Sequence, residues 1–177
     1  MSNWTTVSNT PHPWEQEALD FLREQLPSQK LYAWSNFEFV ADGGAIYELD
    51  ALVIDPWGAF LIEIKSRPGA VSGRGNSWRW SHEGRTYSND NPLLLTNRKA
   101  KALISVLGRQ KAFNKVRPPF LEALVFLSHE TNTINLTGND AFHIANRDGI
   151  GDAIKARECR GLRPFTTPPI SIHQIRA

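Results

Sequence analysis

The most constraining feature of this chain is a pair of neighbouring apolar runs, residues 45–54 and 59–65, that carry Asp50, Glu63 and Lys65 among their charged residues. An Asp-Pro-Trp-Gly sequence separates the runs and predicts two strands joined by a tight turn. Asp50 lies on the first strand, and Glu63 and Lys65 lie on the second. Side chains alternate between the faces of a strand, so Glu63 and Lys65 share a face. Because an unpaired buried charge is costly, the three charges must offset one another or bind a metal ion.

Hydrophobic periodicity predicts the other elements. Ala18, Leu22 and Leu26 recur at helical spacing and predict a first helix that Pro27 ends. The expected order is a helix (14–26), a strand (31–40), the two strands described above, a short peripheral hairpin (78–80 and 85–87), a long helix (91–114), a buried strand (121–128), a short strand (141–145) and a helix (150–160). This order predicts an α/β fold in which helices cover a mixed sheet.

Length and composition indicate one globular domain. The 177 residues are 41% hydrophobic and include six Trp and nine Phe, which is enough for a core. Residues 1–13 are interpreted as an extended lead-in, 14–160 as the domain, and 161–177, with three prolines, as a tail or linker. The net charge of +2 does not by itself indicate a nucleic-acid partner.

Several classes of protein are excluded by composition. A single cysteine, Cys159, excludes an intramolecular disulfide framework and a Cys-rich zinc site. The chain has no apolar run of about 18 residues and no signal-peptide pattern. We therefore expect a cytoplasmic protein with no membrane partner.

The three charges predict a metal-assisted site. Consecutive strands usually pair, so Asp50 and Glu63 can lie close together, and two such carboxylates repel unless a cation lies between them. Oxygen ligands without His or Cys nearby select Mg²⁺ or Mn²⁺. Lys65 would stand beside the ion and could orient a water molecule or offset charge on a phosphate, as phosphodiester hydrolysis requires. The alternative is an ordinary surface Glu-Lys pair.

These motifs resemble a known family. The sequences Tyr-Glu-Leu-Asp50-Ala-Leu-Val-Ile and Gly-Ala-Phe-Leu-Ile-Glu63-Ile-Lys65-Ser, a following Gly69 and the Asn91-Pro92 pair are similar to those of the nuclease-related (NERD) domain of the PD-(D/E)XK superfamily. The first helix, ending in Gln-Leu-Pro, also resembles that of the family, and the likeness spans residues 14–128.

The resemblance implies a restriction-endonuclease-like αβββαβ core and a metal-dependent nuclease. It makes Asp50 and Glu63 the ligands of Mg²⁺ or Mn²⁺ and adds the backbone carbonyl of Ile64 as a further ligand. It also makes Lys65 the catalytic lysine and Glu15, on the first helix, an accessory acid. Superfamily members often dimerise to cut both strands, which makes a homodimer an expectation for this chain.

One position departs from the family pattern. Many family members carry a glutamine three residues after the Asn-Pro pair, where this chain has Leu95. Either Gln110 or a basic residue replaces the glutamine, or the site is weakened.

The long helix is basic. Residues 91–121 contain seven basic residues and no acid. Such a helix can track phosphates, whereas the alternative is a solvated face. The residues expected to bind nucleic acid, with DNA favoured over RNA, are Arg98, Lys99, Lys101, Arg109, Gln110 and Lys111. Trp78 and Trp80 either stack on bases or pack in the core.

The chain further resembles the N-terminal segment of large bacterial protein kinases of the BREX/Pgl type, which are linked to phage defence. It has no kinase glycine loop or catalytic-loop motif, so no kinase activity is expected of it. A C-terminal kinase domain outside this chain and other defence proteins are the expected partners. Two hypotheses remain open, a DNA-cleaving module and a non-cleaving nucleic-acid or protein docking module.

Overall fold

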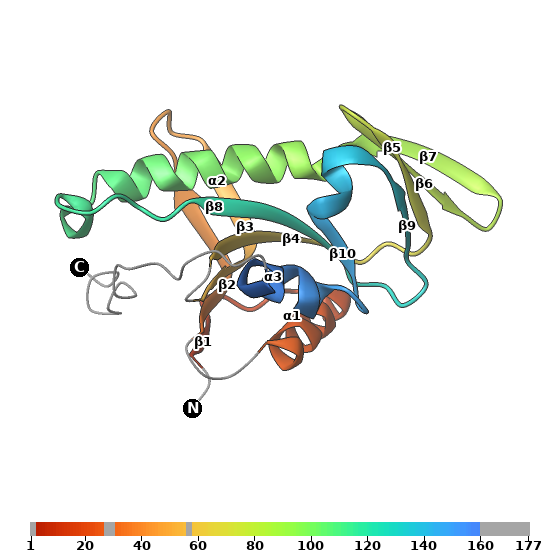
Figure 1. The fold of residues 1–177 in the computed structure, drawn as a ribbon, viewed down its shortest axis with the longest axis horizontal. Coiled ribbons are helices and arrows are strands. Elements are labelled where there is room, and N and C mark those ends of the chain that lie inside the picture. The colour runs from red at the N-terminus through yellow and green to blue at the C-terminus, as the bar shows by residue number, and fades with distance from the viewer. Residues whose placement is uncertain (1–2, 27–30, 56–57, 160–177) are drawn as a thin grey trace.

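The computed structural model describes residues 3–26, 31–55 and 58–159 of the chain (Figure 1). Its elements are, in order, β1 (Trp4–Thr6), α1 (Pro13–Gln25), β2 (Tyr32–Val40), β3 (Ile46–Ile54), β4 (Ala59–Lys65), β5 (Ala70–Arg74), β6 (Ser77–His82), β7 (Arg85–Asp90), α2 (Pro92–Gly108), the 3₁₀ helix η1 (Lys111–Phe113), β8 (Leu121–Leu127), β9 (Thr133–Leu136), the 3₁₀ helix η2 (Gly138–Phe142), β10 (Ile144–Asn146) and α3 (Ile150–Cys159). The elements α1, β2, β3, β4, α2 and β8 confirm the predicted αβββαβ core.

The main sheet has six strands in the order β1-β2-β3-β4-β8-β10. Strands β2, β3 and β4 form the predicted antiparallel meander, and β8 pairs parallel to β4. The sheet is therefore mixed, as expected. Residues 4–6, which were predicted only as part of an extended lead-in, form β1 and pair parallel to β2 at one edge of this sheet.

A second sheet, in the order β7-β6-β5-β9, was only partly predicted. The hairpin of β6 and β7 was expected, whereas β5 and β9 were not. β5 ends in Ser-Gly-Arg, which breaks its apolar pattern, and β9 alternates polar and apolar residues over only four positions, too few to identify a strand. They pair with each other in parallel although about sixty residues separate them, a contact that only the fold can create.

Two predicted boundaries change. The long helix ends at Gly108, where Arg109 forms its C-cap, and η1 follows as a separate turn. The predicted strand 141–145 is half wrong, because residues 138–142 form η2 and the strand starts at Ile144.

Both faces of the main sheet are covered. Helices α1 and α3 lie on one face, and α2 lies on the other with the second sheet beside its N-terminal end (Figure 1). The predicted stripe of α1 is buried: Ala18, Leu19 and Leu22 pack against Phe60, Ile62 and Phe126 in the sheet. The side chains of Trp78 and Trp80 are also buried, between the second sheet and β8, so packing and not base stacking explains them.

Two predictions fall on residues that the structure does not describe. The predicted tail, 161–177, and the helix stop at position 27 lie outside the described residues. Within the part of the chain that the structure describes, no helix is both long enough and apolar enough to cross a membrane.

The fold makes a simple stability prediction. Leu22→Ala removes a fully buried side chain, so we expect it to lower the free energy of unfolding by about 2–5 kcal/mol, measured by urea denaturation. Leu94→Ala is the matched control, because Leu94 also lies on a helix but is 46% exposed. Equal effects of the two substitutions would contradict the packing of α1 described here.

Candidate active site

The two predicted metal-binding acids lie on neighbouring strands at the end of their shared ladder. The register of β3 and β4 pairs Ala51 with Ile62, and Asp50 and Glu63 are the next residues along each strand. Continuing the same register places these two acids opposite each other. The Asp50 carboxylate reaches the backbone beside Glu63, because its Oδ2 accepts a hydrogen bond of 2.6 Å from the N–H of Ile64.

A break in the sheet accompanies Asp50. The register of β2 and β3 pairs Ser35 with Ala51 and Phe37 with Leu49, and skips Asn36 and Asp50 between them. Asn36 has a φ of 53°, which is uncommon for a residue other than glycine. Both strands therefore have a local irregularity at this position.

This irregularity changes which side chains face α2. Trp34 and Phe37 on β2 both pack toward α2, as do Leu49 and Leu52 on β3. In each strand the two residues are three apart, and strict alternation would place them on opposite faces. Asp50 thus lies where the alternation of side chains between the two faces of β3 is interrupted. The sequence pattern does not reveal this interruption.

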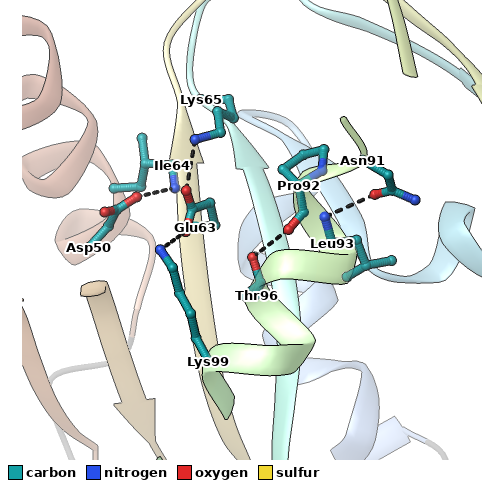
Figure 2. Close-up of polar contacts among 9 residues, drawn as sticks. All are labelled: Asp50, Glu63, Ile64, Lys65, Asn91, Pro92, Leu93, Thr96 and Lys99. Atoms are coloured by element: carbon teal, nitrogen blue, oxygen red, sulfur yellow. Dashed lines mark hydrogen bonds and ion pairs between the residues drawn. The ribbon is translucent and has the colours of Figure 1, made fainter. Parts of the chain in front are cut away.

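Glu63 is the most strongly bonded member of the site. Its side chain is 9% exposed, and each of its oxygens contacts an ammonium group (Figure 2). Lys65 Nζ lies 2.7 Å from Oε1, as the shared face on β4 predicts. Lys99 Nζ, from α2, lies 2.7 Å from Oε2.

The electrostatics of the two acids differ. Burial and then repulsion by Glu63 raise the pKa of Asp50 from 3.8 to about 6, against the opposing effects of the Ile64 N–H, Lys65 and Lys99. Burial also acts to raise the pKa of Glu63, but the ion pairs with Lys65 and Lys99 outweigh it and lower that pKa. When both acids are ionised, two carboxylates face two ammonium groups, so the four charges sum to zero.

Helix α2 is positioned by its first residues. The Asn91 side chain accepts a hydrogen bond of 2.9 Å from the N–H of Leu93 and donates to the carbonyl of Gly75 and to Asp140. Pro92 occupies the first turn, as the Asn-Pro pair predicts. The start of α2 is therefore tied to the second sheet and to η2, and this anchor holds the helix over β4.

Lys99 does not belong to the exposed basic face on which the sequence placed it. Its side chain is 10% exposed and its ammonium is bonded to Glu63, two turns into α2. The helical spacing contains the signal for this: Lys99 follows Thr96 by three residues and precedes Leu103 by four, and both are buried. The expectation that Lys99 contacts phosphate is thus corrected to a place within the carboxylate cluster.

The other predicted nucleic-acid contacts lie between the middle of α2 and η1. Arg98, Lys101 and Lys111 are exposed. Arg109 is exposed too but forms an ion pair with Asp42, and Gln110 donates to the carbonyl of Val106.

Two further residues were singled out from the sequence. Glu15 is half-buried on α1 and accepts a hydrogen bond of 2.7 Å from Thr10 Oγ1. Leu95, at the position of the family glutamine, is 42% exposed. Among the described residues, no three His, Cys, Asp or Glu side chains gather into a metal-binding group, so Glu15 does not join Asp50 and Glu63 in one. Its role as an accessory acid stays a prediction.

Comparison with known families identifies the family of this chain. The family model of the nuclease-related domain matches residues 10–128, which run from the start of α1 to the end of β8 and include Asp50, Glu63, Lys65 and Lys99. The chain belongs to the NERD family. The resemblance predicted from the sequence is therefore confirmed, and the described elements β9, β10 and α3 lie beyond the matched part of this NERD domain.

Two individual proteins are also similar to this NERD domain. The protein described as "Probable kinase PglW" from Streptomyces coelicolor is 32% identical over 154 residues, which agrees with the predicted resemblance to Pgl-type kinases. That match covers 86% of this chain but 10% of the relative, so the chain spans about a tenth of the relative's length. The crystal structure of protein VC1899 from Vibrio cholerae matches with a TM-score of 0.38 and 13% identity, over 82% of this chain and 32% of the other.

The burial of Lys99 leads to a prediction about stability. Lys99→Met leaves Glu63 with only the half-exposed Lys65 as a charged partner, so we expect the free energy of unfolding without metal to fall by about 2 kcal/mol. Lys101→Met, an exposed lysine two residues further along α2, should change it by less than about 0.5 kcal/mol. A Lys99 variant as stable as the Lys101 variant would show that the buried ion pair adds nothing to folding.

The raised pKa of Asp50 predicts how stability depends on pH. Between pH 3.8 and about 6 the folded protein holds a proton on Asp50 that the unfolded chain has lost, so this group lowers the free energy of unfolding as pH rises through that window. The loss is on the order of 2–3 kcal/mol.

Asp50→Asn isolates this contribution from that of Glu63. Urea denaturation in EDTA, repeated across the window, should show the wild type losing stability relative to Asp50→Asn as pH rises, because the amide cannot ionise. Parallel pH profiles for the two proteins would mean that Asp50 has an ordinary pKa.

Proposed function

We propose that this NERD domain is a metal-dependent phosphodiesterase that cleaves DNA. The supporting observation is the convergence of Asp50, Glu63 and Lys65 where the β3–β4 ladder ends, with a buried and a partly buried carboxylate beside an accessible ammonium. Membership of the nuclease-related family supports the same reaction class.

Asp50 and Glu63 are suited to hold a divalent cation. Both ligands are carboxylates, and the proposed addition of the Ile64 carbonyl keeps the donor set all oxygen, which suits Mg²⁺ or Mn²⁺. Burial and then repulsion by Glu63 raise the pKa of Asp50, and a cation between the acids would relieve the repulsion. When bound, such an ion supplies Lewis-acid activation of a phosphate oxygen or of water.

Lys65 is the proposed catalytic lysine. Its side chain is 38% exposed, so its ammonium can approach a substrate while it remains close to Glu63. There it can orient the attacking water or offset the negative charge that develops on the phosphate. Glu15 is proposed as an accessory acid on α1.

The exposed basic residues of α2 and η1 are proposed to bind the DNA backbone. Arg98, Lys101 and Lys111 have exposed side chains, and the segment contains no acid that would repel phosphate. Arg109 and Gln110 would contribute once Arg109 leaves Asp42. Backbone contacts of this kind predict an affinity that falls steeply with salt. DNA is favoured over RNA, and a homodimer would allow both strands to be cut.

A second candidate function is a docking module without cleavage. It is favoured by Leu95 in place of the family glutamine and by the two lysines that already bond both oxygens of Glu63. Similarity to the protein described as a probable kinase PglW suggests the context for either function, a cytoplasmic phage-defence system with a kinase domain and other defence proteins as partners.

The two candidates make different predictions in a cleavage assay. The purified chain is incubated with plasmid, linear DNA or RNA in Mg²⁺, Mn²⁺ or EDTA, beside Asp50→Asn and Lys65→Ala. We expect metal-dependent DNA cleavage that each substitution slows by about 100-fold or more. Lys155→Ala, an exposed lysine on α3, should cleave like the wild type.

The other outcomes decide against the nuclease. Cleavage that persists unchanged in both site variants would identify a contaminating enzyme. DNA binding without cleavage in either metal would support the docking module instead.

A further inference from the structure

Lys99 is the one buried cation of the carboxylate cluster, and its place there bears on how the cluster takes up metal. We infer that Lys99 is a built-in competitor of the divalent cation at Glu63. Its ammonium holds Oε2, so an ion that binds Asp50 together with this oxygen must compete with Lys99 for it. This inference rests on the proposed metal-binding role of Asp50 and Glu63.

The contacts of Glu63 carry the inference. Lys65 bonds Oε1 and Lys99 bonds Oε2, each at 2.7 Å, so an ammonium group meets each oxygen of the carboxylate. A divalent ion on Oε2 would take over the oxygen that Lys99 now holds and would repel that ammonium at short range. Because of this repulsion, metal binding and the Lys99–Glu63 bond compete for this oxygen.

The two lysines are unequal competitors. The Lys65 side chain is 38% exposed and can turn into water when an ion arrives. The Lys99 side chain is 10% exposed and lies on the buried stripe of α2 between Thr96 and Leu103. Moving its charge away from Glu63 means leaving an ammonium without its partner in a poorly hydrated place, which is costly.

The anchoring of α2 strengthens this competition. Asn91 caps the helix through Leu93 and also bonds Gly75 and Asp140, so the start of α2 cannot move away from β4 without breaking these contacts. The backbone of α2 thus keeps Lys99 within reach of Glu63. The consequence is a site that is neutral and folded without metal and that binds metal weakly until Lys99 is displaced.

Metal-binding measurements test this on the full chain. The free-ion signal of Mn²⁺ in electron paramagnetic resonance gives the Kd for wild type, Lys99→Met, Lys65→Met and Lys101→Met. We expect Lys99→Met to bind Mn²⁺ at least about tenfold more tightly than wild type, equivalent to about 1.4 kcal/mol. Lys65→Met should tighten binding less, and the exposed Lys101→Met should stay within about twofold of wild type.

Asp50→Asn separates failure of this inference from failure of the proposed function. If Lys99→Met and wild type bind Mn²⁺ equally and Asp50→Asn loses the ion, Lys99 is no competitor but the metal site stands. If none of the proteins binds Mn²⁺, the metal site itself is wrong and the inference goes with it.

A measurement on the wild-type protein avoids dependence on a destabilised variant. The Nζ–H signals of ¹⁵N-labelled lysines are followed while Mg²⁺ is added until binding saturates. The Lys99 signal should shift or vanish in step with saturation, because its ammonium leaves Glu63, while that of Lys101 stays in place. A Lys99 signal that is unchanged at saturation would overturn the inference.

Discussion

The buried carboxylate of Glu63 is the constraint on which the rest of this structure depends. An ionised carboxylate with 9% of its side chain exposed is tolerated only when its charge is balanced nearby. The balance comes from two different elements, Lys65 on the same strand and Lys99 on α2. A single side chain thereby links the central sheet to the helix that covers it.

This link explains why the helix must be anchored at its start. The Asn91 cap ties α2 to the second sheet through Gly75 and to η2 through Asp140. Lys99 lies on the same helix, so its ammonium is placed by these contacts as much as by its own packing. The second sheet, which lies outside the αβββαβ core, thus helps to position a charge inside it.

The cluster combines repulsion between two carboxylates with an overall balance of charge. Burial and then repulsion by Glu63 raise the pKa of Asp50, yet two lysines make the four charges sum to zero. The charges of the cluster therefore balance without a metal ion, and Asp50 and Glu63 remain available for the proposed nuclease chemistry. Family membership, the basic surface of α2 and the exposed ammonium of Lys65 all fit that chemistry.

The sequence by itself determined the core order of elements, the turn between β3 and β4, and the shared face of Glu63 and Lys65. These features follow from local periodicity and short motifs, which act over a few residues. Only the tertiary structure decided the break in the sheet at Asp50, the pairing of β5 with β9 and the burial of Lys99. Each of these features depends on contacts with residues far away in the chain. A charged residue such as Lys99 is predicted to be exposed unless the element that packs against it is known.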